Sequence, residues 1–432
     1  MRSRTSAPSS TGDQSAWCRG MRDGNPPERR AATVFRLLTQ GQFALFFTFN
    51  GLSLIGSWMQ RIASAWLIWE WTGSAFWVGV LAACDLLPVV LTGPFAGVAA
   101  DRWDRLWQNR IAQIASAILA LINAVLLMAG MLGLFGLLTL IALQGTLIAM
   151  VQPARLAMVP QLVAREDMPT AVALASVNVN LARLIGPAVA GAMILRFPIE
   201  WIFIANFVVT ALFVVALGRI RLAPRAESAG QGGIWQQMAE GFSYVARMPT
   251  VRLIMLFMLV GGMMVRAIQE LTPALAAQTF AVSATGLAVL SSATAAGAVI
   301  SGLTMARTGA RRLFLGVIGF WTVGAISALV LAWTRHPLVA SLAAAVLGFS
   351  VSRSLISTQT FVQLETPDEL RGRALSTHGL IARASPALGA LIIGYLADRF
   401  GLAVGVTAAS ITMLVFAAIL FPYARSVADR TL

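Results

Sequence analysis

The chain has 432 residues, of which 58% are hydrophobic and only 12% are charged, and its mean hydropathy is +0.77. Soluble domains carry about 25% charged residues, so the composition excludes an ordinary soluble protein. The net charge of +14 comes entirely from arginine, because the chain has no lysine. Spread over many connections, this charge favours contact with anionic lipid over nucleic-acid binding. Two cysteines indicate neither a disulfide framework nor a metal cluster.

The arginines are concentrated in every second connection between apolar segments. The two tails and one set of alternate connections hold 24 of the 32 arginines, the other connections hold three, and five lie inside apolar segments. Positive charge is retained on the cytoplasmic side of a membrane. We therefore expect a multi-pass protein of the cytoplasmic (inner or plasma) membrane with both termini in the cytoplasm.

Twelve apolar segments are long enough to cross a bilayer, which takes about 20 residues. In chain order they are 42–70, 74–100, 108–130, 134–155, 170–195, 200–218, 252–272, 285–305, 312–333, 337–360, 373–397 and 402–423. Residues 1–40, rich in Ser, Pro, Gly and Arg, are expected to form a disordered cytoplasmic tail. We expect a six-helix bundle over 41–218, a cytoplasmic linker over 219–250, a second six-helix bundle over 251–423 and a cytoplasmic tail over 424–432.

Short motifs recur in the two halves of the chain. Ala182-Arg183 precedes Pro187, and Ala382-Arg383 precedes Pro386; two further sets match in the same order, all at offsets between 199 and 205. Together they indicate a parallel repeat of six plus six helices. Such a repeat places the substrate path between the halves, near the middle of the membrane.

The connection after the second apolar segment contains Gly97, Asp101, Arg102 and Arg105. Gly97 permits close helix approach, and Asp101 can pair with an arginine or with the positive end of a helix. We expect this motif to act as a gate that holds the cytoplasmic side shut in one state. The alternative is an ordinary helix end with charges at the lipid boundary. In the second half of the chain, Ala306 stands where the aspartate would be, so we expect the gate to have its carboxylate in the first half alone.

This motif resembles the loop signature of the major facilitator superfamily, although Asp104 stands where the superfamily usually has Gly and Leu106 where it has a basic residue. Within the superfamily, residues 40–423 resemble the exporter branch of enterobactin-exporter, macrolide-efflux and transmembrane secretion effector proteins. The segments that carry the resemblance include Trp58 to Arg61, Pro153 to Arg155, Asn180 to Pro187, Pro367 to Arg373 and Gly394 to Gly401. It implies an all-α membrane protein with the major facilitator fold: twelve transmembrane helices in two six-helix bundles around a central cavity.

The fifth apolar segment contains Gly186, Pro187 and Gly191. Small residues allow tight packing, and the proline removes one helical hydrogen bond, which favours a bend. The segment resembles the Gly-Pro motif that antiporters of the superfamily carry at this place, which favours export over import. The alternative is a membrane helix that is simply rich in small residues.

We count seven charged side chains as clearly intramembrane: Arg61, Asp85, Arg183, Arg266, Glu270, Arg353 and Arg383. Each costs about 2.5–3.5 kcal/mol to insert, so each is a candidate for proton coupling or for charge in the cavity. The alternative is a structural pair or an arginine that extends to the interface. Arg61 and Asp85 flank the expected hairpin tip at Thr72 and should lie at similar depth. Arg266 and Glu270, four residues apart, could pair on one helix face.

No nucleotide-binding loop, metal-ligand spacing or catalytic constellation is present, so we expect neither an enzyme nor a cofactor. The resemblance implies a monomeric secondary transporter that exports a small organic molecule by proton antiport and alternating access. The molecule would be a siderophore-like or other secondary metabolite, or a drug. We expect Asp85 to carry the proton with Arg61 as its counter-ion, and the excess of arginine favours an anionic or neutral substrate. The alternatives are a lipid or lysophospholipid flippase of the same fold and a membrane sensor or scaffold without transport.

Overall fold

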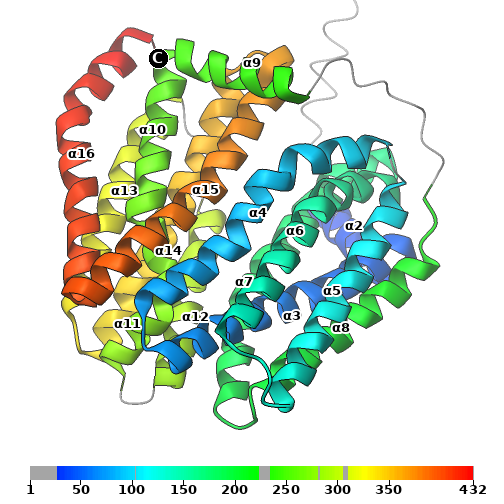
Figure 1. Ribbon diagram of the computed structural model, residues 1–432. Helices are drawn as coiled ribbons and strands as arrows, with labels where there is room; N and C mark the ends of the chain where they lie inside the picture. The colour runs from blue at the N-terminus through cyan, green and yellow to red at the C-terminus, as the bar shows by residue number, and fades with distance from the viewer. Residues whose placement is uncertain (1–26, 103, 223–233, 281–282, 305–309, 432) are drawn as a thin grey trace, which may run out of the picture.

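The computed structural model describes residues 27–102, 104–222, 234–280, 283–304 and 310–431, which are almost entirely helical (Figure 1). The first part of the chain forms α2 (Pro27–Thr39), α3 (Gly41–Thr72), α4 (Ala75–Arg102), α5 (Arg105–Met128), α6 (Leu134–Met158), η1 (Val159–Leu162), η2 (Arg165–Asp167), α7 (Met168–Ile194) and α8 (Glu200–Arg219). The second part forms α9 (Ile234–Arg247), α10 (Pro249–Met264), η3 (Arg266–Leu271), α11 (Thr272–Thr279), α12 (Ser283–Leu303), α13 (Ala310–Trp333), α14 (Pro337–Glu365), α15 (Asp368–Phe400) and α16 (Leu402–Thr431).

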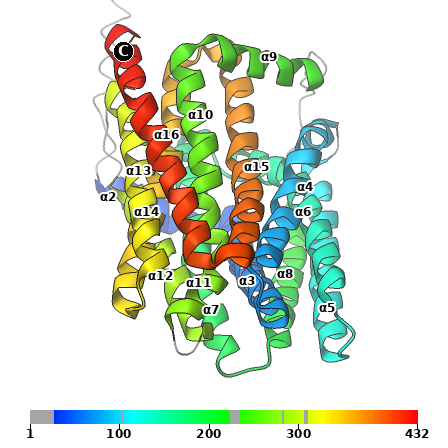
Figure 2. The ribbon, with the colours of Figure 1, turned by 60° about the vertical axis from the view of Figure 1, so that its left-hand side comes forward.

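The helices form two bundles that lie side by side, α3–α8 and α10–α16 (Figures 1 and 2). This arrangement confirms the predicted fold class. Small residues set the spacing of the helices, because a β-carbon at Gly145 of α6 would lie 2.6 Å from the carbonyl oxygen of Asp85 in α4. In a membrane, such close approach replaces the hydrophobic driving force that lipid cannot supply.

Eleven helical stretches in the described part of the chain are long and apolar enough to cross a membrane. The 32-residue α3 is not one of them, because polar side chains such as Asn50, Gln60 and Arg61 interrupt it. At 1.5 Å per residue, α3 is still longer than the roughly 30 Å hydrocarbon core. The helix α3 occupies the place of the first predicted span. If it also crosses the membrane, the count rises from eleven to twelve, and this crossing stays a prediction.

Part of the expected disordered tail, residues 1–40, is helical, and there the expectation is wrong. In α2, Leu37 is buried against Phe43 and Phe46 of α3. An ion pair of 2.6 Å joins Arg36 to Asp167, at the start of α7. An amphipathic segment next to a bundle is ordered by the apolar surface that it covers. Residues 1–26 lie outside the described part of the chain.

Both remaining segments outside the predicted bundles also contain helix. In the linker, α9 lies across one end of the second bundle (Figures 1 and 2). There Glu240 pairs with Arg373, and the hydroxyl of Tyr244 donates to the carbonyl of Glu365 at 3.2 Å. The predicted tail over 424–432 is not a separate segment, because α16 continues to Thr431 with Ala428 fully buried.

Candidate functional site

A tight turn between α3 and α4 sets the depth of the first charged pair. Gly73 ends α3 in the left-handed conformation, with φ of 58°, and its N–H donates to the carbonyl of Trp69 at 2.8 Å. The chain therefore reverses at once, and Arg61 and Asp85 lie opposite each other. Arg61 Nη1 is 2.6 Å from Asp85 Oδ2, as their distances from the hairpin tip predict. We call this end of the molecule the Gly73 end and the opposite one, which carries α9, the linker end.

The seventh predicted span is broken where its charges lie. The α-helix α10 stops at Met264, η3 is a 3-10 helix, and α11 begins with a proline, Pro273, in its first turn. A 3-10 helix has three residues per turn, so residues four apart point in directions that differ by roughly 120°. Arg266 and Glu270 therefore point in different directions: the possible ion pair between them is not formed, although both side chains line the same cavity. The guanidinium of Arg266 instead donates to the carbonyl of Ala382 in α15.

Glu270 pairs with Arg61 across the two bundles. Its Oε2 is 2.9 Å from Arg61 Nη2, while the other nitrogen of the same guanidinium binds Asp85. We call Asp85, Arg61 and Glu270 the ion triad. Arg61 and Asp85 belong to the first bundle and Glu270 to the second, so the triad joins the halves. An arginine suits this position because its planar fork holds two oxyanions at once.

A central cavity of about 160 Å³ lies beside the triad, lined by residues of α3 and α7 from the first bundle and of η3, α11, α12 and α14 from the second. Arg61, Arg183, Arg266 and Glu270 all line it, together with the ring of Trp58. Sites for drug-sized ligands run from about 300 to 1,000 Å³. The cavity must therefore widen to admit a molecule of that size. A surface depression of about 460 Å³ along α16 contains none of these groups.

Trp58 is an aromatic platform for two of the cavity arginines. The guanidinium carbons of Arg61 and Arg183 lie 5.4 and 5.3 Å from the centroid of its ring system. Both distances fall within the range of attraction between a cation and an aromatic face. Arg61 is held by two carboxylates as well, whereas Arg183 lines the cavity with its Nε buried and without a hydrogen-bond partner. Arg183 therefore has more N–H groups available for hydrogen bonds to a ligand than Arg61 has.

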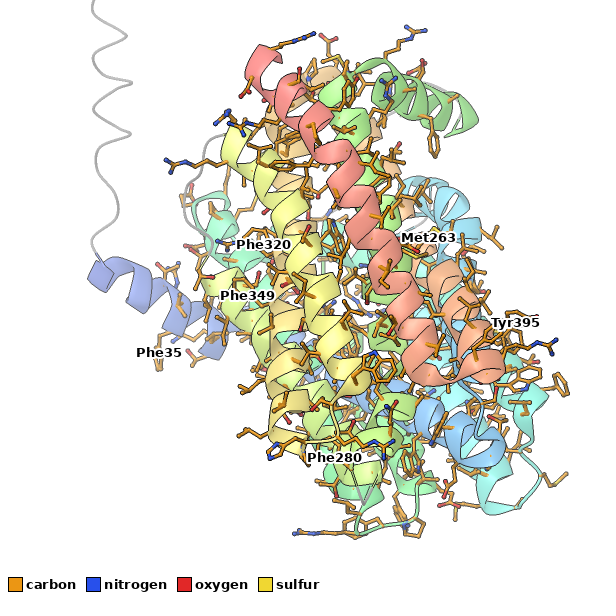
Figure 3. The ribbon with its side chains drawn as sticks, turned by 90° about the vertical axis from the view of Figure 1, so that its left-hand side faces the viewer. Phe35, Met263, Phe280, Phe320, Phe349 and Tyr395 are labelled. Atoms are coloured by element: carbon orange, nitrogen blue, oxygen red, sulfur yellow. The ribbon has the colours of Figure 1, made fainter. Side chains whose placement is uncertain are left out.

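Arg353 lies away from the cavity and stabilises a helix end. Its guanidinium donates to the carbonyls of Ser301 at 2.8 Å and Thr304 at 3.1 Å, at the end of α12. It also lies 5.7 and 6.0 Å from the rings of Phe320 and Phe349, which Figure 3 labels on the same side of the second bundle. A helix leaves its last carbonyls without partners, and a cation there is favourable. The contacts of Arg353 are those of a structural residue.

Arg383 is also absent from the cavity lining, and its Nη1 donates to the carbonyl of Gly379 in its own helix at 3.4 Å. The cavity and the triad together hold three arginines and two carboxylates, a formal charge of +1. The sequence alone gives an excess of +3 for all seven intramembrane charges. The cavity is therefore less positive than the sequence indicates.

The side-chain surroundings of most of the predicted gate lie outside what the structure describes. The backbone of α4 runs through Gly97, Asp101 and Arg102, but the surroundings of these residues are not described, and their role stays a prediction. Arg105 Nη1 donates to the carbonyl of Ala157 at 3.3 Å, where α5 meets the end of α6. The departure from the superfamily signature at Asp104 has a local reason: its carboxylate caps α5 by accepting from the N–H of Trp107 at 2.7 Å.

The Gly-Pro motif lies at the places where α7 approaches its neighbours. A β-carbon at Gly186 would lie 2.4 Å from that of Trp58, and one at Gly191 would lie 2.0 Å from that of Ala288 in α12. Pro187 lines the central cavity. The motif therefore sets the contact of α7 with the first bundle and with the second.

Sequence reasoning missed Asn206, which lies in the otherwise apolar middle of α8. Its Nδ2 donates to Gln60 Oε1 at 2.6 Å, and Thr210 Oγ1 lies 3.3 Å from Ser53 Oγ in the same interface. Buried polar groups in a membrane protein are hydrogen-bonded between helices. Because Gln60 precedes Arg61, this network fixes the rotation of α3 that directs Arg61 to its partners. The only signal in the sequence is an isolated amide within an apolar segment.

Comparison with known proteins identifies the family. The family model of transmembrane secretion effectors matches residues 32–430 of the chain. The chain belongs to this family, within the major facilitator superfamily. This transmembrane secretion effector is accordingly a multi-pass transporter of the cell membrane and not an enzyme.

Several relatives have names that identify them as transporters. The macrolide efflux protein A of Streptococcus pyogenes is 24% identical over 83% of this chain and 90% of its own length. The enterobactin exporter of Salmonella typhimurium is 25% identical over 83% of this chain and 86% of its own length. The staphyloferrin A transporter of Staphylococcus aureus is 29% identical, but the match spans 37% of this chain and only 41% of that protein.

Solved structures of transporters share the fold. A bacterial homologue of the human lysosomal transporter Spinster, in an inward-facing and unoccupied conformation, superimposes with a TM-score of 0.69 over 94% of this chain and 99% of its own, at 15% identity. The nucleoside transporter NupG gives a TM-score of 0.66 over 92% and 98%, also at 15% identity. These likenesses confirm the major facilitator fold.

Proposed function

We propose that this transmembrane secretion effector exports a small organic molecule across the cytoplasmic membrane by alternating access. Relatives named for enterobactin export and macrolide efflux align over more than four-fifths of the chain, which supports export. The distribution of arginine supports cytoplasmic termini. The linker end then faces the cytoplasm and the Gly73 end faces outward.

The observation that carries the proposal is the ion triad, because it joins the two bundles through one guanidinium. Protonation of Glu270 removes the anion that Arg61 binds in the second bundle and weakens the link between the bundles. Protonation of Asp85 removes the competing anion within the first bundle and leaves Arg61 to Glu270 or to a bound anion. An opposite charge favours the ionised carboxylate, whereas burial disfavours it, so a mobile arginine can switch a carboxylate between the two forms. We propose that Asp85 carries the proton and that Glu270 is the second carrier to test.

The cavity supports an anionic or neutral substrate. Arg183 and Arg266 present guanidinium groups to the same space as Trp58, and a positively charged site of low dielectric attracts anions and repels cations. A substrate with carboxylate or other oxyanion groups can compete with Glu270 for Arg61. Proton entry and substrate release are then coupled through one shared side chain.

Transport by purified protein in proteoliposomes tests the proposal. Acidifying the compartment at the Gly73 end should drive substrate into that compartment, with enterobactin and a macrolide as the first two probes. Asp85→Asn should abolish this gradient-driven accumulation while substrate exchange without a gradient continues. Glu70→Gln removes an exposed carboxylate near the Gly73 turn and serves as the control. Accumulation in Asp85→Asn with an unchanged dependence on pH would show that another group carries the proton.

A further inference from the structure

At the Gly73 end, α4 of the first bundle and α15 of the second are in direct backbone contact. A β-carbon at Gly79 would lie 2.4 Å from the carbonyl oxygen of Ala390, and one at Gly394 would lie 2.6 Å from that of Ala75. The ring of Tyr395, labelled in Figure 3, meets that of Phe76 edge to face, with centroids 6.5 Å apart. Only glycine allows the two helices to approach so closely.

Asp398, in the last turn of α15, binds the first turn of α4. Its carboxylate accepts a hydrogen bond from the N–H of Ala75 at 2.8 Å and another from the hydroxyl of Ser74. Ser74 Oγ in turn accepts from the N–H of Trp77 at 3.2 Å. The first N–H groups of a helix have no partners within the helix, and a negative charge there is favourable. The second bundle therefore supplies part of the N-terminal cap of a helix in the first.

We infer that Asp398 holds the Gly73 end of the transport path closed and that transport requires its release. Alternating access moves one bundle against the other around the substrate site, so this end must open in one state. The two hydrogen bonds join opposite bundles and exist only while that end is closed. A contact made in one state alone shifts the populations of both. The inference rests on the proposed alternating access but not on the substrate or the coupling ion.

The role differs from the one predicted for Asp101. Asp398 is followed by Arg399 and resembles a second copy of the gating motif, yet it lies at the Gly73 end, opposite to the end expected for Asp101. Two aspartates at opposite ends can close the path alternately. Loss of the Asp398 contact should then favour the state that is open at the Gly73 end.

Electron–electron distance measurement between two spin labels tests this inference on the full chain in lipid nanodiscs without substrate. The labels replace the exposed Trp71 and Phe400, on either side of the Gly73 end, after both native cysteines are changed to serine. Asp398→Ala should raise the ratio of long-distance to short-distance populations about fivefold, the effect of losing a typical helix cap. Asp398→Asn keeps an oxygen that can accept from Ala75 and should restore most of the wild-type distribution.

Two further variants make the outcome decisive. Asp429→Ala removes an exposed carboxylate that pairs with Arg311 inside the second bundle, and it should leave the distances unchanged. Gly79→Leu forces α4 and α15 apart and should raise the long-distance population whether residue 398 is Asp or Ala.

The inference is overturned if Asp398→Ala retains the wild-type distribution, whether or not Gly79→Leu changes it. If Asp398→Ala does not fold, Ser74→Ala removes the donating hydroxyl and carries the same test, with an unchanged distribution again contradicting the inference. A wild-type protein that samples both distances but moves no substrate contradicts the proposed function alone.

Discussion

Arg61 is the side chain through which charge connects the two bundles. It binds Asp85 at 2.6 Å and Glu270 at 2.9 Å and lies over Trp58. Arg183 lies over the same ring but has no carboxylate at ion-pair distance among the described residues. The division of roles follows from these contacts: Arg61 links the bundles, and Arg183 is available to a ligand.

The availability of Arg183 predicts how binding responds to substitution. We expect Arg183→Ala to weaken binding of an anionic ligand about 10- to 100-fold, because a hydrogen bond to a charged group contributes about 1.5–3 kcal/mol. Arg353→Ala is the matched control, since Arg353 binds carbonyls at the end of α12 and does not line the cavity. Titration calorimetry in detergent measures both. Equal losses in the two variants, or preferential binding of cationic dyes that Arg183→Ala leaves unchanged, would contradict an anion site at Arg183.

At the scale of the elements, breaks and small residues position the site. The 3-10 geometry of η3 turns Glu270 toward α3 and leaves Arg266 bound to α15. Gly191 brings α7 against α12, and Gly79 brings α4 against α15, so two helix pairs close the interface between the bundles. A 3-10 stretch in the middle of a span often marks a hinge. The bundles are therefore in close contact at glycines, and Arg266 and Glu270 lie at a helix break.

The packing of α7 against α12 predicts a loss of transport on adding one methyl group. In Gly191→Ala the new β-carbon would meet that of Ala288 at 2.0 Å, so α7 and α12 must separate. Overpacking costs about 1–3 kcal/mol, and we expect transport to fall about tenfold. Gly136→Ala, whose β-carbon would meet only a flexible leucine side chain at 3.4 Å, should transport normally. If Gly191→Ala transports as well as the wild type and has the same thermal stability, close contact between α7 and α12 is not required for transport.

At the scale of the whole molecule, the linker and the Gly73 turn lie at opposite ends of the bundles, as Figure 1 shows for α9 and the start of α4. The family and the fold require a membrane around the bundles. Which end faces the cytoplasm follows from the arginine distribution alone, so the orientation stays a prediction.

Thiol labelling in intact cells tests that orientation. An impermeant maleimide should modify a cysteine at Trp71, beside the Gly73 turn, in a chain whose native cysteines are serine. A chain with Cys18 as its single cysteine should react only after the cells are opened, because we place the N-terminal tail in the cytoplasm. The reverse pattern would invert the membrane orientation and, with it, the assignment of the two ends.

The sequence by itself determined eleven of the twelve predicted membrane-crossing segments, the repeat of motifs in the two halves and the depth at which Arg61 meets Asp85. These features depend on local hydropathy and on counting residues from a hairpin tip, which need no knowledge of packing. The tertiary structure alone decided that Glu270 binds Arg61, that Arg353 closes the end of α12 and that Asp398 caps α4. Each of these depends on the rotation of one helix against another far away in the chain. A 3-10 break and a buried amide network set that rotation, and neither leaves a periodic pattern in the sequence.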